Sequence, residues 1–337
     1  MTTPMKILIV RVSSLGDVVH NMPMVADILR RFPDAHIDWV VEEAYADLVR
    51  LNRGVRDIIP FALRRWRKTL LTEQTRAEMR AFSSRLRSIA YDVIFDTQGL
   101  LKTGLVMRLA RLAPGGRRVG LANGTEGSGY EGLSRIFHTM SVPVGLRTHG
   151  VLRGRLVTAA ALGYEVDTPA DFDLQPPPLQ TLPSWLPEEP YAAFFHATAR
   201  AAKQWAPDHW GRLGRMVAAR GLPVLLPWGS PAEKHAAEDL ASRMPNARVL
   251  PKLPMMEAVL LAQRARLAVG VDTGLTHIAA AYCRPTIELY CDSPRWKTEG
   301  NWSPNIVNLG DTGAPPGVDE VEAAVDRLLA ATESALS

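Results

Sequence analysis

The chain alternates between short aliphatic runs and longer stretches in which apolar residues recur every three or four positions. Uninterrupted aliphatic runs are typical of parallel strands covered on both faces, and the second spacing is typical of amphipathic helices. The first run, residues 7–10, ends in a loop of small residues. Because Pro23 suits the first turn of a helix, we expect the next helix to begin near Asn21. Asp17 and His20 then lie in the loop.

The same alternation continues to residue 162 and predicts one doubly wound parallel sheet. A polar, glycine-rich loop at residues 123–129 separates its last predicted strand from its last predicted helix. The further strands predicted here are residues 37–41, 57–61, 92–96 and 117–121, and the further helices are residues 44–51, 73–89, 98–110 and 149–162.

Prolines punctuate residues 165–190, where their density excludes a central strand and is typical of a stiff linker. We therefore predict a first domain over residues 1–165, a linker over 166–190 and a second domain over 191–337. The alternation restarts in the second domain, so the predicted fold is α/β with two Rossmann-like domains that face each other across a cleft.

The second domain ends with a helix predicted at residues 318–329, which can pack on either domain. The other elements predicted there are strands at residues 191–196, 223–227, 248–250, 267–271 and 285–290, and helices at 208–220, 231–244, 255–264 and 273–283.

Length and composition fit this interpretation, because 337 residues with 47% hydrophobic and 22% charged residues suit two globular domains. The two cysteines are too few for a disulfide framework, and no apolar run reaches the roughly 18 residues that span a bilayer. Since the amino terminus also lacks the build of a signal peptide, we expect a cytoplasmic protein. The net charge of +4 does not by itself indicate nucleic-acid binding, and we expect none.

One basic cluster changes this picture, because residues 64–68 (RRWRK) place four cations around Trp66. Such a cluster suits an anionic substrate or an anionic membrane surface. A solvated helix face would explain the scattered arginines on either side, but it explains this cluster less well.

Asp17 is the first candidate for chemistry, because loops at the carboxyl end of a first parallel strand are where open α/β sheets bind ligands. The alternative is a carboxylate that caps a helix, which would contribute about 1 kcal/mol of stability. Its position alone does not decide between the two.

The second domain offers three further loops at the ends of predicted strands. In the first, Thr198 and Lys203 precede a helix, a combination that suits a phosphate, although an ordinary capped loop is the alternative. In the second, Glu233 suits either a sugar hydroxyl or the helix dipole.

The third loop, VGVDTGLTHIAAA at residues 269–281, is the strongest signal. A strand ends at Asp272, turns through Thr273 and Gly274, and opens a helix whose free N–H groups form an anion site. His277 lies one turn into that helix, where the alternative is a buried structural histidine.

Several segments, taken in order, resemble the lipopolysaccharide heptosyltransferases of glycosyltransferase family 9: SSLGDVVHNMP, WVVEE, RRWRK, DTQGLLKT, HATARAAKQW, LPWGSP and VDTGLTHIAAA. The resemblance runs from residue 6 to about residue 290, and RRWRK with HATARAAKQW is closer to the enzyme that adds the first heptose than to the enzyme that adds the second. The segment CDSPRWKTEGNW departs from the small-residue loop usual in the family.

The resemblance implies a GT-B architecture and an inverting, metal-independent transfer of L-glycero-D-manno-heptose from ADP-heptose to the Kdo residue of Kdo2-lipid A. ADP-heptose is then a substrate and no cofactor is expected. The enzyme is expected at the cytoplasmic face of the inner membrane. Alternatives are a family member with another acceptor, such as the second heptosyltransferase, and a two-lobed anion-binding protein without activity.

The resemblance also implies roles for single residues, with Asp17 as the general base and Trp66 at the membrane interface. His20 is expected to be structural or to lie on the acceptor side. The implied donor-binding residues are Thr198, Lys203, Glu233, Leu253, Asp272, Thr273, Gly274 and His277, and the implied acceptor-binding residues are Ser14, Arg64, Arg65, Arg67, Lys68, Lys102, His149 and Arg153.

Overall fold

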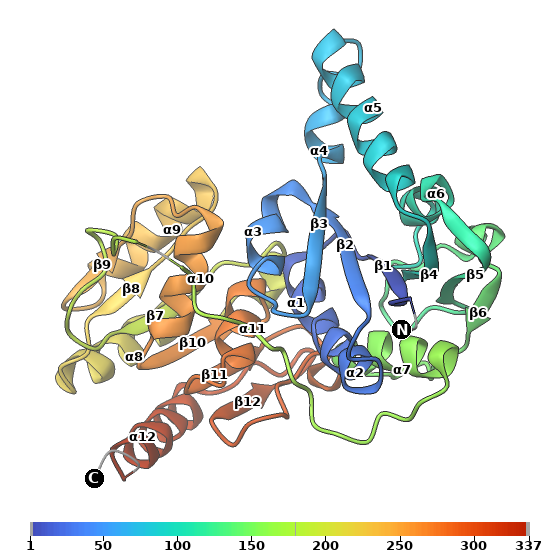
Figure 1. The fold of residues 1–337 in the computed structure, drawn as a ribbon. Coiled ribbons are helices and arrows are strands. Elements are labelled where there is room, and N and C mark those ends of the chain that lie inside the picture. Colours follow the sequence, from blue (N-terminus) through green and yellow to red (C-terminus); the bar gives the residue numbers. More distant parts are fainter. Residues whose placement is uncertain (1–2, 179, 335–337) are drawn as a thin grey trace. The chain divides into compact units, whose positions relative to one another are not determined.

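A computed structural model describes residues 3–178 and 180–334 of the chain, and it divides into two compact units (Figure 1). The first unit runs to Gln175 and the second begins at Pro176, so the division lies inside the proline-rich stretch. Each unit is built around one parallel sheet.

The first sheet has six strands in the order β3-β2-β1-β4-β5-β6, and every neighbouring pair is parallel. Short β6 was not predicted, whereas the other strands fall where the aliphatic runs indicated. The bounds are β1 Lys6–Val10, β2 His36–Glu42, β3 Val55–Phe61, β4 Tyr91–Asp96, β5 Leu112–Leu121 and β6 Met140–Val142.

Helices cover both faces of this sheet, as the unalternating strands require. Leu8 and Val10 belong to the same buried cluster as Leu86 of α5 and Met107 of α6, while Ile7 and Ile9 are equally buried on the opposite face. The helices are α1 Leu15–Asn21, α2 Pro23–Arg31, α3 Ala46–Val49, α4 Leu63–Trp66, α5 Glu73–Ser88, α6 Leu101–Leu109 and α7 Gly150–Leu162.

The prediction that the first helix begins near Asn21, with Asp17 in a loop, is wrong. Helix α1 already begins at Leu15, with Ser14 as its N-cap and Asp17 in its first turn. The Asp17 carboxylate accepts a hydrogen bond from the Ser14 backbone N–H at 3.1 Å, which stabilises this early start. Pro23 instead begins a second helix, α2.

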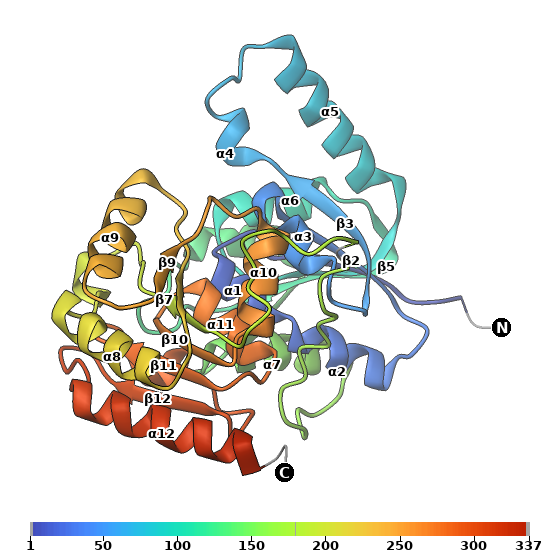
Figure 2. The ribbon, with the colours of Figure 1, turned by 90° about the vertical axis from the view of Figure 1, so that its left-hand side faces the viewer.

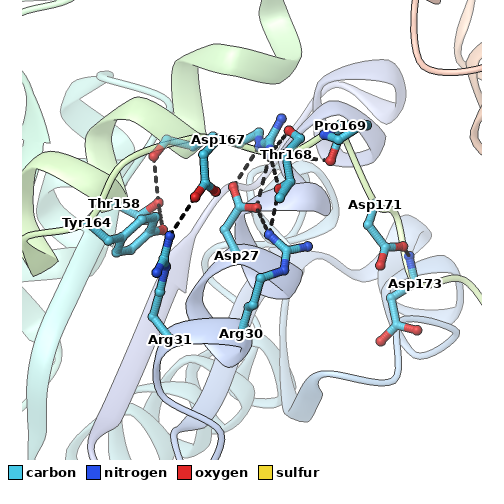
Figure 3. A network of polar contacts seen from close by, with 11 residues as sticks. Asp27, Arg30, Arg31, Thr158, Tyr164, Asp167, Thr168, Pro169, Asp171 and Asp173 are labelled. Atoms are coloured by element: carbon cyan, nitrogen blue, oxygen red, sulfur yellow. Dashed lines mark hydrogen bonds and ion pairs between the residues drawn. The ribbon is translucent and has the colours of Figure 1, made fainter.

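The segment after α7 is tied to the first unit by a polar network (Figure 3). Asp27 on α2 and Arg155 on α7 form a buried ion pair of 2.6 Å, and Arg155 also donates to the Thr168 carbonyl at 2.8 Å. A second, exposed ion pair joins Arg31 to Asp167 at 2.8 Å. The chain therefore follows the first unit past residue 165 before it reaches the second.

The second sheet also has six parallel strands, in the order β12-β11-β10-β7-β8-β9. Counted from its own first strand, this is the order of the first sheet, and it is the order of a dinucleotide-binding Rossmann fold. Edge strand β12 was not predicted. The bounds are β7 Ala192–Phe195, β8 Val224–Leu226, β9 Ala247–Val249, β10 Leu267–Val271, β11 Thr286–Tyr290 and β12 Ile306–Gly310.

The carboxyl-terminal helix packs on the second unit, which decides between the two positions considered. Val321, Val325 and Leu328 of α12 join the buried cluster that contains Phe194 and Trp210. The helices of this unit are α8 Pro207–Ala219, α9 Pro231–Ser242, α10 Met255–Arg264, α11 Gly274–Ala281 and α12 Val318–Ser334.

Each sheet has one point where the strand order reverses, and ligands of open α/β sheets bind at the carboxyl ends of the strands there. In the first unit this point lies between β1 and β4, and in the second it lies between β7 and β10. Asp17, Lys203 and Asp272, which the sequence singled out, follow β1, β7 and β10 at these points.

Candidate functional site

Asp17 lies at the switch point of the first sheet, with one carboxylate oxygen facing two arginines. Its Oδ1 is 2.6 Å from Arg11 Nη2 and 3.6 Å from Arg153 Nη2, while its Oδ2 accepts a hydrogen bond from Ser14 Oγ at 2.8 Å. Both arginines are buried, but 35% of the Asp17 side chain is exposed. A ligand can therefore reach this carboxylate.

The surroundings of Asp17 keep it ionised. Burial raises its pKa, but Arg11, Arg153 and the hydrogen bonds from Ser14 more than offset this and hold the pKa well below its usual range. Asp17 thus caps α1 and also presents a permanent negative charge at the switch point, so the capping and functional interpretations are compatible.

Arg11 was not identified from the sequence. It is 4% exposed, and its Nη1 donates to the Thr97 carbonyl at 2.5 Å, which ties the end of β1 to the loop after β4. Gln98 adds to this link by accepting from the Val12 N–H at 3.0 Å. The signal that could have revealed Arg11 is a cation directly after four buried aliphatic residues.

Of the acceptor candidates, His149 directly precedes α7 and Arg153 lies within it. His149 is the N-cap, and its Nδ1 accepts from the Val151 N–H at 3.2 Å, while Arg153 donates to Thr125 Oγ1 at 3.1 Å. Burial lowers the pKa of Arg153 to about 10, and nearby Arg11 adds to the effect. His20 is buried in α1 with its ring 6.4 Å from that of His149.

Two residues of the basic cluster, Arg65 and Trp66, are held by neighbouring carboxylates. Arg65 pairs with Glu43 at 3.0 Å and with Glu78 at 2.7 Å, and Trp66 Nε1 also donates to Glu78 at 2.8 Å. Trp66 is 4% exposed, so the expectation that it lies at a membrane interface is wrong.

The reason lies in the packing of the α4 helix. The Trp66 ring contacts those of Phe61 and Phe82 at centroid distances of 5.5 and 5.6 Å, because the aromatic residue completes the core beneath α5. Exposed cations remain around it, namely Arg64, Arg67 and Lys68. Half-buried Lys102 lies near them, and burial, together with the charges of Arg64 and Arg67, lowers its pKa.

The switch point of the second sheet holds a chain of charged side chains. Lys203 pairs with Asp272 Oδ2, and Asp272 Oδ1 is 3.1 Å from His277 Nε2. The other ring nitrogen of His277 is 2.9 Å from Glu288 Oε1. The structure therefore brings together Lys203, Asp272 and His277, which the sequence predicted, and adds Glu288, which it did not.

Electrostatics fix the charge states in this cluster. Burial raises the pKa of Asp272, but hydrogen bonds and charges from His277 and Lys203 hold it well below its usual range. Burial lowers the pKa of His277, but its two carboxylate neighbours raise it to about 10. At neutral pH the cluster therefore contains two cations and an ionised Asp272.

The remaining donor candidates lie in loops and helix starts around these strands. Thr273 is the N-cap of α11 and Gly274 its first residue, so the free N–H groups of that helix begin directly after Asp272. Glu233 accepts from the N–H groups of Gly229 at 2.6 Å and Ser230 at 3.0 Å, as a capping carboxylate does. Thr198, after β7, and Leu253, after β9, are half-buried.

None of the described helices is both long and apolar enough to cross a membrane. Over residues 3–178 and 180–334, no group of three or more His, Cys, Asp and Glu side chains is arranged to hold a metal ion.

Comparisons with known proteins find heptosyltransferases. A profile described as "Glycosyltransferase family 9 (heptosyltransferase)" matches residues 79–324. The chain is 38% identical over 287 residues to lipopolysaccharide heptosyltransferase 1 of Pseudomonas aeruginosa, with 85% of this chain and 78% of the relative covered. It is 37% identical over 289 residues to the protein of the same name from Escherichia coli K12, with 85% and 88% covered.

The fold agrees with these relatives. A solved structure described as "E. coli heptosyltransferase WaaC with ADP" superposes with a TM-score of 0.83 at 32% identity, and covers 96% of this chain and 100% of that one. The predicted α/β fold with two Rossmann-like domains of the GT-B type is confirmed.

Proposed function

The chain belongs to glycosyltransferase family 9, and from this we propose that it transfers L-glycero-D-manno-heptose from ADP-heptose to the Kdo residue of Kdo2-lipid A. It is a glycosyltransferase of lipopolysaccharide biosynthesis, with a nucleotide-heptose as donor and a lipopolysaccharide precursor as acceptor. The particular heptose and the particular acceptor sugar are part of the proposal.

One observation carries the proposal: the same strand order occurs twice, with an accessible carboxylate at one switch point and Lys203 beside the start of a helix at the other. A carboxylate that remains ionised suits the removal of a proton from an acceptor hydroxyl. Cations beside the N-terminus of a helix suit a diphosphate. Transfer from a nucleotide-sugar to an alcohol uses both.

In the proposed step, the acceptor hydroxyl oxygen forms a bond to the anomeric carbon of the heptose as the bond from that carbon to the β-phosphate oxygen breaks. Asp17 takes the proton of the hydroxyl, and ADP leaves with the electron pair of the broken bond. Attack from the face opposite the leaving group inverts the anomeric configuration. A positioned base is worth about 100- to 10,000-fold in the rate of such a step.

The negative charge that grows on ADP is stabilised by Lys203 and by the N–H groups at the start of α11. We propose that these groups do the work for which other transferases use a divalent metal. Glu233 and the backbone at Leu253 are proposed to contact the ribose and the adenine, and Thr198 to contact the diphosphate.

Arg64, Arg67, Lys68 and Lys102 are proposed to hold the anionic groups of the acceptor. Ser14, His149 and Arg153 are proposed to contact the acceptor beside Asp17. Arg65 is also proposed to contact the acceptor, with its side chain held in place by ion pairs with Glu43 and Glu78.

The experiment that tests the proposed function is a competition between acceptors. Purified protein with ADP-heptose should heptosylate Kdo2-lipid A in preference to an acceptor that already has its first heptose, and EDTA should leave the rate unchanged. Preference for the heptosylated acceptor would favour the second heptosyltransferase activity. Tight ADP binding without turnover of either acceptor would favour a binding protein.

We also propose that the protein binds the anionic cytoplasmic face of the inner membrane through the turn between α4 and α5. These helices project away from the first sheet in both ribbon views (Figures 1 and 2). Leu70 and Leu71 in this turn are 49% and 84% exposed, and they follow the exposed cations Arg67 and Lys68. Apolar side chains next to cations suit a surface with apolar chains below anionic headgroups.

Sedimentation with vesicles should show salt-sensitive binding to anionic lipid and weak binding to neutral lipid. The double variant Leu70→Ser/Leu71→Ser should lose about tenfold in vesicle affinity, since neither serine can insert an apolar side chain below the headgroups. Leu146→Ser, which changes a leucine that is 64% exposed elsewhere in the same unit, is the control and should bind as the wild type does. Equal binding to neutral and anionic vesicles would contradict the proposal.

A further inference from the structure

His277 is held between two carboxylates from different elements. Its Nδ1 is 2.9 Å from Glu288 Oε1 on β11, and its Nε2 is 3.1 Å from Asp272 Oδ1 at the end of β10. An ionised carboxylate only accepts hydrogen bonds, so both ring nitrogens must donate, which makes the ring an imidazolium. The His277 and Glu288 side chains are 4% and 0% exposed, so water does not replace either contact.

Glu288 is an unusual residue for its position. Every residue of β11 is buried, and a central parallel strand normally has an aliphatic side chain there. A buried carboxylate is costly unless it is paired and hydrogen-bonded. Its second oxygen, Oε2, accepts from Tyr290 Oη at 3.0 Å and from the Gly300 N–H at 2.8 Å, so all the partners of this carboxylate are donors.

The Gly300 contact joins Glu288 to the segment of residues 292–302. A Cβ at residue 300 would lie 2.7 Å from Ile306 Cγ2, so a larger residue here would require Ile306 to move. The same segment also contacts the loop and helix at residues 269–281. Thr298 Oγ1 lies 3.4 Å from Asp272 Oδ1, and Trp302 Nε1 donates to the Ala280 carbonyl at 2.8 Å. Glu288 therefore contacts both the stretch of residues 269–281, through His277, and the segment of residues 292–302, through Gly300.

We propose that Glu288 is a positioning residue of the donor site, which holds His277 as an imidazolium against Asp272 and so fixes the Asp272–Lys203 pair beside the start of α11. The proposal rests on the proposed function in that the ligand is the diphosphate of a nucleotide-sugar. Without the Glu288 charge, a neutral His277 can present a lone pair to Asp272 and release that carboxylate from its fixed orientation. Lys203 then loses its fixed position as well.

Asp272 and Glu288 face His277 directly, and Lys203 and Tyr290 contact these two carboxylates in turn. These neighbours raise the pKa of His277 to about 10. In Glu288→Gln the amide still accepts from Nδ1 but has no charge, so the pKa of His277 should fall towards the ordinary value of about 6.5. The donor site should then weaken as the pH rises past that lower pKa.

Two measurements test the proposal, and the first compares the wild type with Glu288→Gln. NMR titration of the His277 ring, assigned with His277→Asn, should show an imidazolium to at least about pH 9 in the wild type and a pKa lower by at least about 1 unit in Glu288→Gln. In the second, kcat/KM for ADP-heptose should fall about tenfold in Glu288→Gln at about pH 9, with a smaller loss at about pH 6.

Tyr290→Phe is the matched control, because it removes a donor to the other oxygen of the same carboxylate and leaves the His277 contact intact. It should change kcat/KM by less than about twofold at either pH. The double variant Glu288→Gln/His277→Asn should lose no more activity than His277→Asn alone, since Glu288 acts through His277.

Three results would each overturn the proposal: a wild-type His277 that titrates near 6.5, a loss in Glu288→Gln that does not depend on pH, or losses that multiply in the double variant. If Glu288→Gln does not fold, the wild-type titration decides alone. Failure of the proposed function would appear separately, as a wild type that does not consume ADP-heptose. The NMR titration would still show whether Glu288 holds His277 as an imidazolium, because it does not depend on turnover.

Discussion

Asp17→Asn is expected to reduce the rate of heptose transfer by about 100- to 10,000-fold, because the amide cannot take the proton of the acceptor hydroxyl. The substitution keeps the shape of the side chain and an oxygen that accepts from the Ser14 N–H, so α1 should retain its cap. ADP affinity, measured by calorimetry, should stay within about twofold of the wild type, since the proposed donor residues belong to the second unit.

Asp167→Asn provides the matched control, because it changes an exposed aspartate of the same unit that also pairs with an arginine. It should leave turnover unchanged. Thermal unfolding of both variants shows whether either has lost its fold at the assay temperature. Near-wild-type turnover by a folded Asp17→Asn would eliminate Asp17 as the base.

The pH dependence gives an independent check on Asp17. Because Arg11 and Arg153 hold its pKa below the ordinary value of 3.8, the carboxylate remains ionised as the pH falls to that value. The stability gained from these pairs is present above the ordinary pKa and is lost only as the pH falls through the lower, folded one. We therefore expect no acidic limb from Asp17 in kcat/KM above about pH 4.

The sequence predicted the buried elements closely because their apolar pattern is strong. Predicted residues 267–271 and 255–264 coincide with β10 and α10. The two missed strands, β6 and β12, are at the edges of their sheets and are partly exposed, so an aliphatic run does not mark them. The early start of α1 was missed because Pro23 was assigned to the first helix instead of the second.

Some residues of the candidate site could likewise be found from the sequence, and others could not. Asp17, Lys203 and Asp272 could be found because each follows a predicted strand in a loop where a charged residue is conspicuous. Arg11 directly follows one strand and Glu288 lies inside another, and no local pattern in the sequence indicates the ion pairs that they form with Asp17 and His277. Trp66 shows the opposite error, since a basic sequence context does not reveal that the ring between the cations is buried.

Lys203→Ala is expected to weaken ADP binding by about 10- to 100-fold, as loss of a hydrogen bond to a charged group costs about 1.5–3 kcal/mol. The loss has two sources. The diphosphate loses a cation, and Asp272 then faces the diphosphate with its Oδ2 no longer paired to an ammonium group. Lys203→Arg should recover part of the affinity, because it restores the charge but not the shape of the ammonium group.

Adenosine and a second cation separate this electrostatic effect from a loss of structure. Adenosine has no phosphate, so its affinity should be nearly the same for Lys203→Ala and for the wild type. Arg248→Ala removes an exposed arginine of the same unit that pairs with Glu189, and it should leave ADP binding unchanged. Equal losses of ADP and adenosine affinity in Lys203→Ala would mean that Lys203 shapes the site instead of binding the diphosphate. A loss confined to ADP, and smaller at high salt, would place the charge of Lys203 beside the phosphates.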